Sequence, residues 1–336
     1  MSENASPQGI PPLAPLADYK DRHVGLLVFG ILEILLGVMC LLMVGFIILG
    51  QAMLSRTPGA FDSRMMVPGM LVYVGLAAVF VWVGIGSIRC RRWARALMLI
   101  LAWAWLCVGL ISVPVMGFVM PGILATSTPK GQGLPQGALV VILVVQLVFM
   151  TLLMVVVPGV LVFFYQSRHV KATCETRDPV RRWTDACPLP VLALACFLWL
   201  GSVSMLIYPF AYGGVLPLFG TIVSGLPGTL LAVVLAGVWF WLGQMCYRIK
   251  IAGWWALLAI LIVFSISSFI TFLHLDIMDL YRKMGLPEAQ LDLIRRQGLI
   301  SSKFMLWTSV VWLVPTLGYL IWVKRFFRPV TQAEGR

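Results

Sequence analysis

Eight long runs of apolar residues, separated by shorter polar segments, organise this chain. A helix needs about 20 apolar residues to cross a hydrocarbon core of about 30 Å. Strands of a membrane barrel would be shorter and would alternate between apolar and polar residues. The pattern therefore predicts an all-α, polytopic membrane helical bundle with eight transmembrane helices. These lie at roughly 24–50, 67–88, 96–118, 138–165, 189–208, 226–246, 252–274 and 305–323.

A sequence pattern in the second apolar run returns in the sixth. Pro68-Gly69, Trp82-Val83-Gly84 and Arg89 recur as Pro227-Gly228, Trp241-Leu242-Gly243 and Arg248, all at the same spacing of 159 residues (227 minus 68). A second set, Pro158 with Pro315 and Arg168 with Arg325, has a spacing of 157 residues (315 minus 158). We interpret the chain as two four-helix membrane repeats. Because each copy has an even number of spans, the two repeats are parallel in orientation.

The distribution of charge predicts how the chain sits in the membrane. Only 11% of the residues are charged and 60% are hydrophobic, whereas roughly a quarter of a soluble domain is charged. The terminal segments and the even-numbered loops hold most of the 25 lysine and arginine residues. The positive-inside rule then places both termini in the cytosol of a multi-pass cell-membrane protein, with the bacterial inner membrane as the expected compartment. The net charge of +12 thus reflects topology, and no nucleic-acid partner is expected.

These features divide the chain into five parts. We expect a disordered cytosolic tail at 1–23, the first repeat at 24–165, a cytosolic linker at 166–188, the second repeat at 189–326 and a cytosolic tail at 327–336. The linker is a solvated connection or, alternatively, a docking or lipid-headgroup site. The outward loop at about 119–137 is expected to be flexible. The outward loop at 275–304 has apolar residues at helical spacing and is expected to form two short interfacial helices, or else an ordered loop packed over the bundle.

Glu33 is the one acidic residue within a predicted span. A charge at this depth is costly, so an intramembrane acid is a candidate functional group. At about 1.5 Å per residue, Glu33 lies near the midplane, at a depth similar to Trp103 and Trp105. We expect the indole N–H groups of those tryptophans to face the carboxyl group. The site is either a structural hydrogen bond or a ligand or proton site.

A basic and aromatic rim is predicted at the cytosolic edge of both repeats. It comprises Arg91, Arg92, Trp93, Arg95, Arg248 and Lys250. Snorkelling cations and an interfacial tryptophan explain such a rim. The alternative is that the rim binds anionic lipid headgroups.

Motifs for catalysis, metal binding or cofactor binding are absent from the sequence. The three histidines, His23, His169 and His274, make no metal-ligand pair, and no nucleophile elbow or phosphate-binding loop is present. Pro158 and Pro315 are expected to kink the fourth and eighth spans. We therefore predict no cofactor, no metal site and no catalytic residue.

Three functional hypotheses follow. The leading one is a non-enzymatic integral membrane protein that serves as a scaffold, an assembly factor or an accessory subunit. The alternative is a transporter or lipid-handling protein with a site between the two repeats near Glu33. The third is a membrane enzyme acting on lipid at the outer interface. Expected partners are the lipid bilayer, anionic lipid headgroups and another membrane protein.

Overall fold

The eight predicted membrane spans are present as long helices. The computed structural model describes residues 19–54, 63–127, 136–286, 288, 291–292, 295 and 302–327. Within these residues, eight helical stretches are long and apolar enough to cross a membrane. They are α1 (His23–Leu54), α2 (Ser63–Ile88), α3 (Arg92–Ser127), α4 (Gln136–Thr151) with α5 (Val157–Gln166), α7 (Leu189–Tyr212), α8 (Leu226–Tyr247), α9 (Ile251–His274) and α12 (Ser302–Val323). The prediction of an all-α polytopic membrane protein is confirmed at this level.

The fourth span is one continuous rod with an irregular middle. A π-helical turn, η1 (Leu152–Val156), joins α4 to α5. Pro158 is the second residue of α5 and so lies in the first turn of that helix, where its missing N–H is best tolerated. The kink expected at Pro158 thus coincides with a π-helical turn.

Shorter elements connect the spans. They are α6 (Arg168–Arg177), the 3-10 turn η2 (Trp183–Asp185), strands β1 (Leu216–Leu218) and β2 (Thr221–Val223), α10 (Ile277–Lys283) and the 3-10 turn η3 (Lys324–Phe327). The strands form an antiparallel hairpin with Leu216 opposite Val223. This hairpin, absent from the sequence prediction, is the one departure from an all-helical fold in the described part of the chain. Its backbone is held by α9, because Ser267 Oγ accepts from the Phe219 N–H and Thr271 Oγ1 accepts from the Gly220 N–H.

The outward loops differ in part from expectation. The segment at 119–137 was expected to be a flexible loop, but α3 continues through Pro121 to Ser127. Prolines are tolerated in such helices because neighbouring groups and local adjustments satisfy the freed backbone. α10 supplies the first of the two short helices expected at 275–304. Most of the second helix, the tail at 1–18 and the tail at 328–336 lie outside the described residues.

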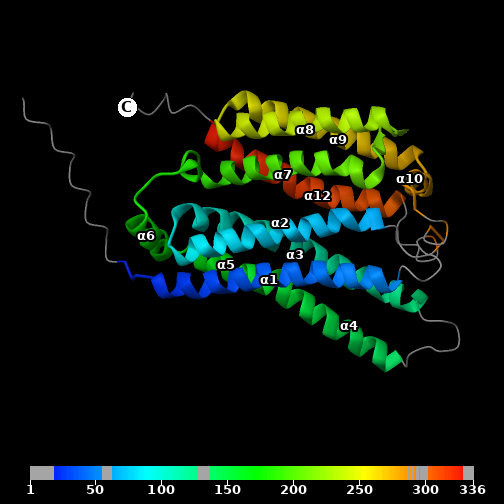
Figure 1. Ribbon diagram of the computed structural model, residues 1–336. Helices are drawn as coiled ribbons and strands as arrows, with labels where there is room; N and C mark the ends of the chain where they lie inside the picture. Colours follow the sequence, from blue (N-terminus) through cyan, green and yellow to red (C-terminus); the bar gives the residue numbers. More distant parts are fainter. Residues whose placement is uncertain are drawn as a thin grey trace, which may run out of the picture.

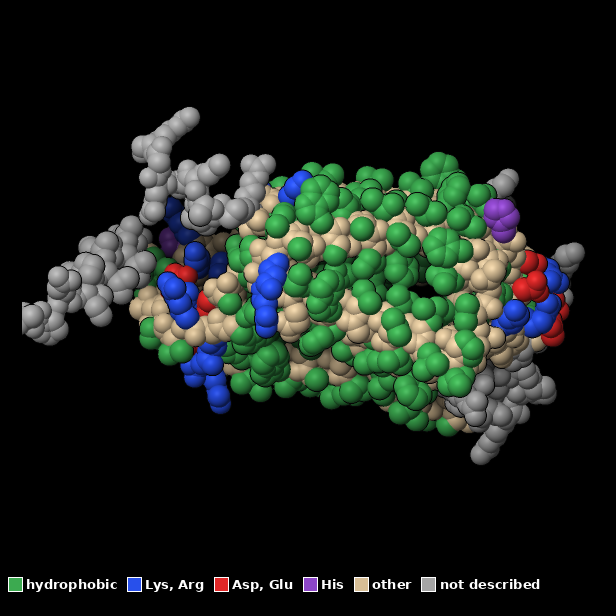
Figure 2. Space-filling view, turned by 90° about the horizontal axis from the view of Figure 1, so that it is seen from above, with side chains coloured by type: hydrophobic (Ala, Val, Ile, Leu, Met, Phe, Trp, Pro, Cys, Tyr) green, Lys and Arg blue, Asp and Glu red, His purple; other side chains and the backbone are tan. Residues whose placement is uncertain are grey.

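The spans form two adjacent groups (Figure 1). One group contains α1, α2, α3 and α5, and the other contains α7, α8, α9 and α12, with α2 and α3 in contact with α7. Each group has its own cluster of buried apolar side chains. α1 and α7 both begin at the end that carries α6 and η3, which we call the terminal side; the opposite end, with the hairpin and α10, is the loop side. Figure 2 shows apolar side chains over the middle of the visible face and charged side chains toward its ends.

In both helix pairs, α1–α2 and α7–α8, the first helix lies against the carbonyl oxygen of an alanine of the second. In α1, a Cβ added at Gly37 would lie 3.0 Å from the Ala77 carbonyl oxygen of α2. In α7, the Ser202 hydroxyl donates to the Ala236 carbonyl oxygen of α8 over 2.8 Å. Ala77 and Ala236 are separated by the spacing found in the sequence. The same faces of α2 and α8 therefore pack on their neighbours.

The turns that follow α2 and α8 are also alike. Cys90 and Ile249 both have a positive φ, of 52° and 56°. The Cys90 N–H donates to the Ser87 carbonyl over 2.9 Å, and the Ile249 N–H donates to the Cys246 carbonyl over 2.8 Å. Few non-glycine residues adopt such a φ. Its occurrence at both Cys90 and Ile249, which have the same spacing as the sequence match, is therefore a distinctive similarity between the two turns.

An aromatic pair recurs between the second and third helices of each group. The Phe80 and Trp105 rings lie 6.1 Å apart, and the Trp239 and Phe264 rings lie 6.2 Å apart. Both members of the second pair follow the first pair at the spacing of the sequence match. α3 therefore contacts α2 at the same level along the helix axis as α9 contacts α8.

Burial in both fourth spans is confined to the terminal side of the matched prolines. From Gly137 to Val157 no residue is buried, whereas Pro158, Leu161, Val162 and Tyr165 are. In α12, burial begins at Leu320, past Pro315. Figure 1 shows α4 diverging from the other helices on the loop side. The loop-side halves of these two spans therefore contribute no buried residue to the described core.

Candidate functional site

Glu33 lies at the centre of a fully buried polar cluster. Its side chain is 0% exposed. The Tyr165 hydroxyl oxygen lies 2.5 Å from Glu33 Oε1, and the Ser87 Oγ lies 2.9 Å from Glu33 Oε2. The Tyr165 and Ser87 hydroxyl oxygens lie 2.9 Å from each other. The three side chains form a closed ring of contacts, which we call the Glu33 triad.

Close helix packing brings the triad together. A Cβ added at Gly84 would lie 2.7 Å from the Gly30 carbonyl oxygen and 3.2 Å from the Glu33 Cβ. The absent side chain lets α2 approach α1 directly. Ser87 is three residues beyond Gly84 and so lies on the same face of α2, toward Glu33.

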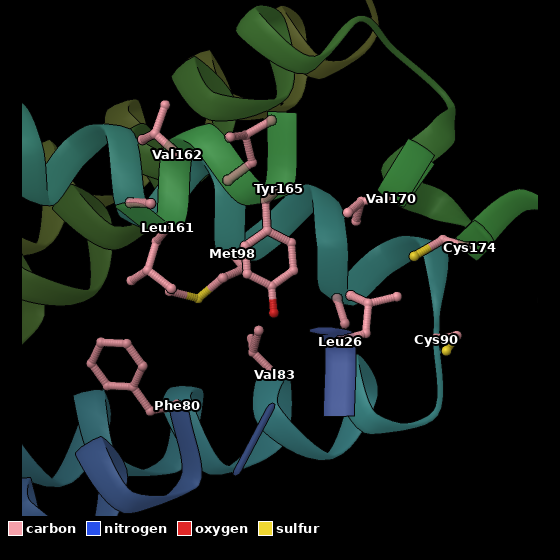
Figure 3. Close-up of a cluster of buried hydrophobic side chains, with 13 residues drawn as sticks. Leu26, Phe80, Val83, Cys90, Met98, Leu161, Val162, Tyr165, Val170 and Cys174 are labelled. Carbon is pink, nitrogen blue, oxygen red and sulfur yellow. The ribbon is translucent and has the colours of Figure 1, made fainter. Parts of the chain in front are cut away.

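Tyr165 comes from the buried end of α5. Figure 3 shows its ring among Met98, Leu26 and Val83, with the hydroxyl group directed toward α2. Tyr165 is 0% exposed and belongs to the core cluster of the first group. The triad therefore joins α1, α2 and α5 through polar contacts inside an otherwise apolar core.

The number of available hydrogens indicates which form of Glu33 fits the ring. Three oxygen–oxygen contacts need three hydrogens, and the two hydroxyl groups supply two. A protonated Glu33 supplies the third, so that each group donates once and accepts once. An ionised carboxylate would leave one short contact without a hydrogen, in surroundings where an unpaired charge is costly. The geometry favours the neutral acid.

The expected partners of Glu33 were wrong. The Trp105 indole N–H points to Met154 Sδ of η1, 3.3 Å away, and the Trp103 side chain is 44% exposed on the outside of α3. The estimate of depth explains the error. Glu33 pairs with residues near the terminal-side ends of α2 and α5, so it lies closer to that side than to the midplane. The sequence analysis did not consider Ser87 and Tyr165, two polar residues near the ends of predicted spans, as partners of Glu33.

The first half of the predicted rim is occupied by ion pairs. Arg91 Nη1 lies 3.1 Å from Asp178 Oδ1, and Arg92 Nη2 lies 3.6 Å from Glu175 and 3.4 Å from Asp185. Asp178 is 1% exposed and also pairs with Arg182. These acids all come from the linker, which the sequence left open as a solvated connection or docking site.

The linker packs onto the first group. Val170, Thr173 and Cys174 of α6 are buried, and burial raises the pKa of the Cys174 thiol to about 12. The Arg22 N–H donates to the Thr173 hydroxyl, and Arg177 pairs with Asp21 at 3.0 Å. This hydrogen-bonded partner lowers the pKa of Asp21. α6 thus covers the α2–α3 turn and fixes the segment before α1.

The remaining rim residues have different surroundings. Trp93 stacks on Trp82 with ring centroids 4.4 Å apart. Arg95 has a buried Nε atom with no hydrogen-bond partner. Arg248 and Lys250 are exposed, and neither makes an ion pair with any described residue. Within the predicted rim, Arg91 and Arg92 therefore form ion pairs with the linker, whereas Arg248 and Lys250 form none with a described residue.

A polar pocket of about 540 Å³ opens on the loop side beside α10. It is lined by His274, Asp276, Asp279 and Arg282, among others. Its acids already have structural roles: Asp276 caps α10 by accepting from the Met278 N–H, and Asp279 pairs with Arg282 at 2.7 Å. No group of three or more His, Cys, Asp or Glu residues suited to a metal ion occurs among the described residues.

A groove of about 580 Å³ lies between α9 and α12. Its walls are mostly apolar, with four hydroxyl groups, from Ser265, Ser268, Ser309 and Thr316. Three of these donate within their own helix, to residues four positions earlier. The groove belongs to the second group of helices and is remote in the fold from the Glu33 triad.

Comparison of the chain with models of protein families, with characterised proteins and with solved structures found no match.

Proposed function

We propose that this chain is a non-enzymatic integral membrane protein that serves as a scaffold, an assembly factor or an accessory subunit. The observation that supports this best is the closed Glu33 triad. A proton-transfer or ligand group needs free lone pairs or hydrogens directed at a water path or a ligand. Here each carboxyl oxygen already has a hydrogen-bond partner, Tyr165 or Ser87, inside a buried core. The triad is suited to holding three helices together.

We also propose that the two groups of helices are parallel copies of one ancestral four-helix unit. Matched packing of α1–α2 with α7–α8, the matched positive φ at Cys90 and Ile249, and the matched aromatic pairs support this. The terminal side is proposed to be cytosolic in a cell membrane, because the unpaired cations of both groups lie there.

Proteoliposomes test the proposal against transport. Wild type and Glu33→Gln are reconstituted around a pH-sensitive dye, and a pH gradient and a membrane potential are imposed. We expect both to dissipate the gradient no faster than empty liposomes. Proton flux in wild type that is lost in a folded Glu33→Gln variant would overturn the proposal.

A second experiment tests the scaffold role directly. The tagged chain is extracted gently from its native membrane and compared in size with the purified chain by native electrophoresis. The proposal predicts a larger assembly in the extract. If the extracted protein migrates at the size of the purified chain in every mild detergent tested, the result would count against the scaffold role.

Lipid handling is the second candidate, and the groove between α9 and α12 is the observation that favours it. The same proteoliposomes, with a fluorescent lipid placed in one leaflet, distinguish lipid handling from a scaffold role. Lipid handling predicts that the labelled lipid moves between leaflets faster than in empty liposomes. An enzyme acting on lipid at the loop-side pocket is the third candidate, supported by the convergence of His274, Asp276 and Asp279.

A further inference from the structure

Carboxylates on the terminal side are distributed unequally between the two groups of helices. The described acids on this side are Asp21, Glu175, Asp178 and Asp185. Each pairs with a cation of the first group, the linker or the segment before α1. None is left for the second group. The local field at the end of the second group is therefore set by cations alone among the described residues.

Four cations make up this end of the second group: Arg248, Lys250, Lys324 and Arg325. None forms an ion pair with a described residue, and Arg248, Lys250 and Arg325 are exposed. They lie around one corner of the bundle. Lys250 caps the start of α9, and Trp254, one turn later, donates its indole N–H to the Leu320 carbonyl just before η3.

Aromatic rings hold two of these cations in place. The Lys324 Nζ lies 4.5 Å from the ring centroids of both Trp254 and Trp255. The Arg325 guanidinium lies 4.4 Å from the Trp322 ring. Tryptophans prefer the headgroup level of a bilayer, and a cation held against their faces stays at that level instead of extending into water.

We propose that Arg248, Lys250, Lys324 and Arg325, with Trp254, Trp255 and Trp322, form a binding site for an anionic phospholipid headgroup of the adjacent leaflet. The phosphate group accepts hydrogen bonds from the guanidinium and ammonium groups. The exposed Trp255 and Trp322 contact the glycerol and upper acyl region of the same lipid, and the buried Trp254 holds Lys324 in place. At the corresponding end of the first group, Asp178, Glu175 and Asp185 of the linker pair with Arg91 and Arg92, so carboxylates there take the place that the proposal gives to the phosphate.

The matched positions of the two groups provide the control. Arg248 and Arg325 correspond in sequence spacing to Arg89 and Arg168, which are also exposed and have no ion pair with a described residue. The variants Arg248→Ala/Arg325→Ala and Arg89→Ala/Arg168→Ala each remove two charges from the same side of the membrane. They differ in the group of helices that they belong to: the linker carboxylates pair with Arg91 and Arg92 at the end of the first group, and no described carboxylate pairs with a cation at the end of the second.

Native mass spectrometry of the full chain in detergent measures binding of phosphatidylglycerol against phosphatidylcholine. We expect wild type to retain phosphatidylglycerol preferentially, and Arg248→Ala/Arg325→Ala to weaken that binding by about fivefold for each charge removed. Arg89→Ala/Arg168→Ala should change it by less than about twofold. Arg248→Lys/Arg325→Lys should retain most of the affinity, which separates loss of charge from loss of fold.

Two results would overturn the proposal. One is equal weakening by both double alanine variants, which would show a general interfacial charge effect. The other is an unchanged preference in a monodisperse Arg248→Ala/Arg325→Ala variant. Competition with inorganic phosphate distinguishes a lipid site from a site for the free anion: the lipid site predicts that phosphate does not displace phosphatidylglycerol.

Discussion

The carboxyl group of Glu33 and the phenol group of Tyr165 meet at 2.5 Å although 132 residues separate them in the chain. This contact, closed by Ser87, joins the first, second and fourth spans. In the second group, a Cβ added at Gly243 would lie 3.4 Å from the Ala195 carbonyl oxygen, as one added at Gly84 would lie 2.7 Å from the Gly30 carbonyl oxygen. Leu198, three residues after Ala195, therefore corresponds to Glu33, and Cys246 corresponds to Ser87; both are buried. One copy of the proposed repeat thus closes this part of its core with polar groups, and the other with apolar ones.

Glutamine is expected to replace glutamate at position 33 without loss of the fold. A glutamine amide can donate one hydrogen and accept one, as the neutral acid does, so the ring of three hydrogen bonds can be retained, although the second N–H hydrogen is left without a partner. Glu33→Gln should therefore lower the free energy of unfolding by about 1–3 kcal/mol, less than Glu33→Ala does. Thermal unfolding in detergent checks this, with Glu33→Ala as the destabilised comparison. A large loss in Glu33→Gln would show that the ionised group is the one that the structure needs.

Gly109 is expected to tolerate no side chain. A Cβ there would lie 1.9 Å from the Met154 carbonyl oxygen of η1, and neither backbone can move independently of its helix. Gly109→Ala should destabilise the protein by at least about 2 kcal/mol. Gly45→Ala is the matched control, because nothing lies within 4 Å of its added Cβ. Equal melting temperatures for the two variants would contradict the close crossing of α3 and the fourth span.

Asp178 is expected to hold α6 onto the bundle. It pairs with Arg91 and Arg182 and accepts from the Arg92 N–H, so Asp178→Asn should release α6. Cys174 reports the release, since burial and a pKa of about 12 keep its thiol unreactive. We expect a maleimide to label Cys174 slowly in wild type and severalfold faster in Asp178→Asn. Glu175→Gln, which removes a longer and more exposed pair, should leave the labelling rate near that of wild type.

The hairpin between α7 and α8 is expected to depend on Thr271. Its hydroxyl accepts from the Gly220 N–H at 3.1 Å and is buried. Thr271→Val preserves the shape and leaves that N–H without a partner, at a cost of about 1–3 kcal/mol. Hydrogen exchange should accelerate at Gly220 in Thr271→Val and remain unchanged in Ser265→Ala, whose hydroxyl bonds only within α9. Unchanged exchange at Gly220 would show that the hairpin is held by other contacts.

Hydropathy predicted the spans well, because the bilayer imposes the same length on each helix whatever its neighbours. Contacts between helices were harder to predict. Counting residues from the start of a span placed Glu33 at the depth of Trp103 and Trp105, whereas its contacts with Ser87 and Tyr165 place it nearer the terminal side. The pairing of Arg91 with Asp178 depends on how α6 folds back onto the bundle. The positive-inside rule counts the charges in each loop and does not predict which of them are in contact. The hairpin at 216–223 was missed because short apolar segments carry no helical or strand period of their own.

The coupling between Glu33 and Tyr165 is the most direct measure of the structural role proposed for the triad. A double-mutant cycle with Glu33→Leu and Tyr165→Phe, read from the free energy of unfolding in a bilayer mimic, isolates that coupling. The account predicts a coupling energy of about 1–3 kcal/mol. Effects that add to within about 0.5 kcal/mol would contradict it.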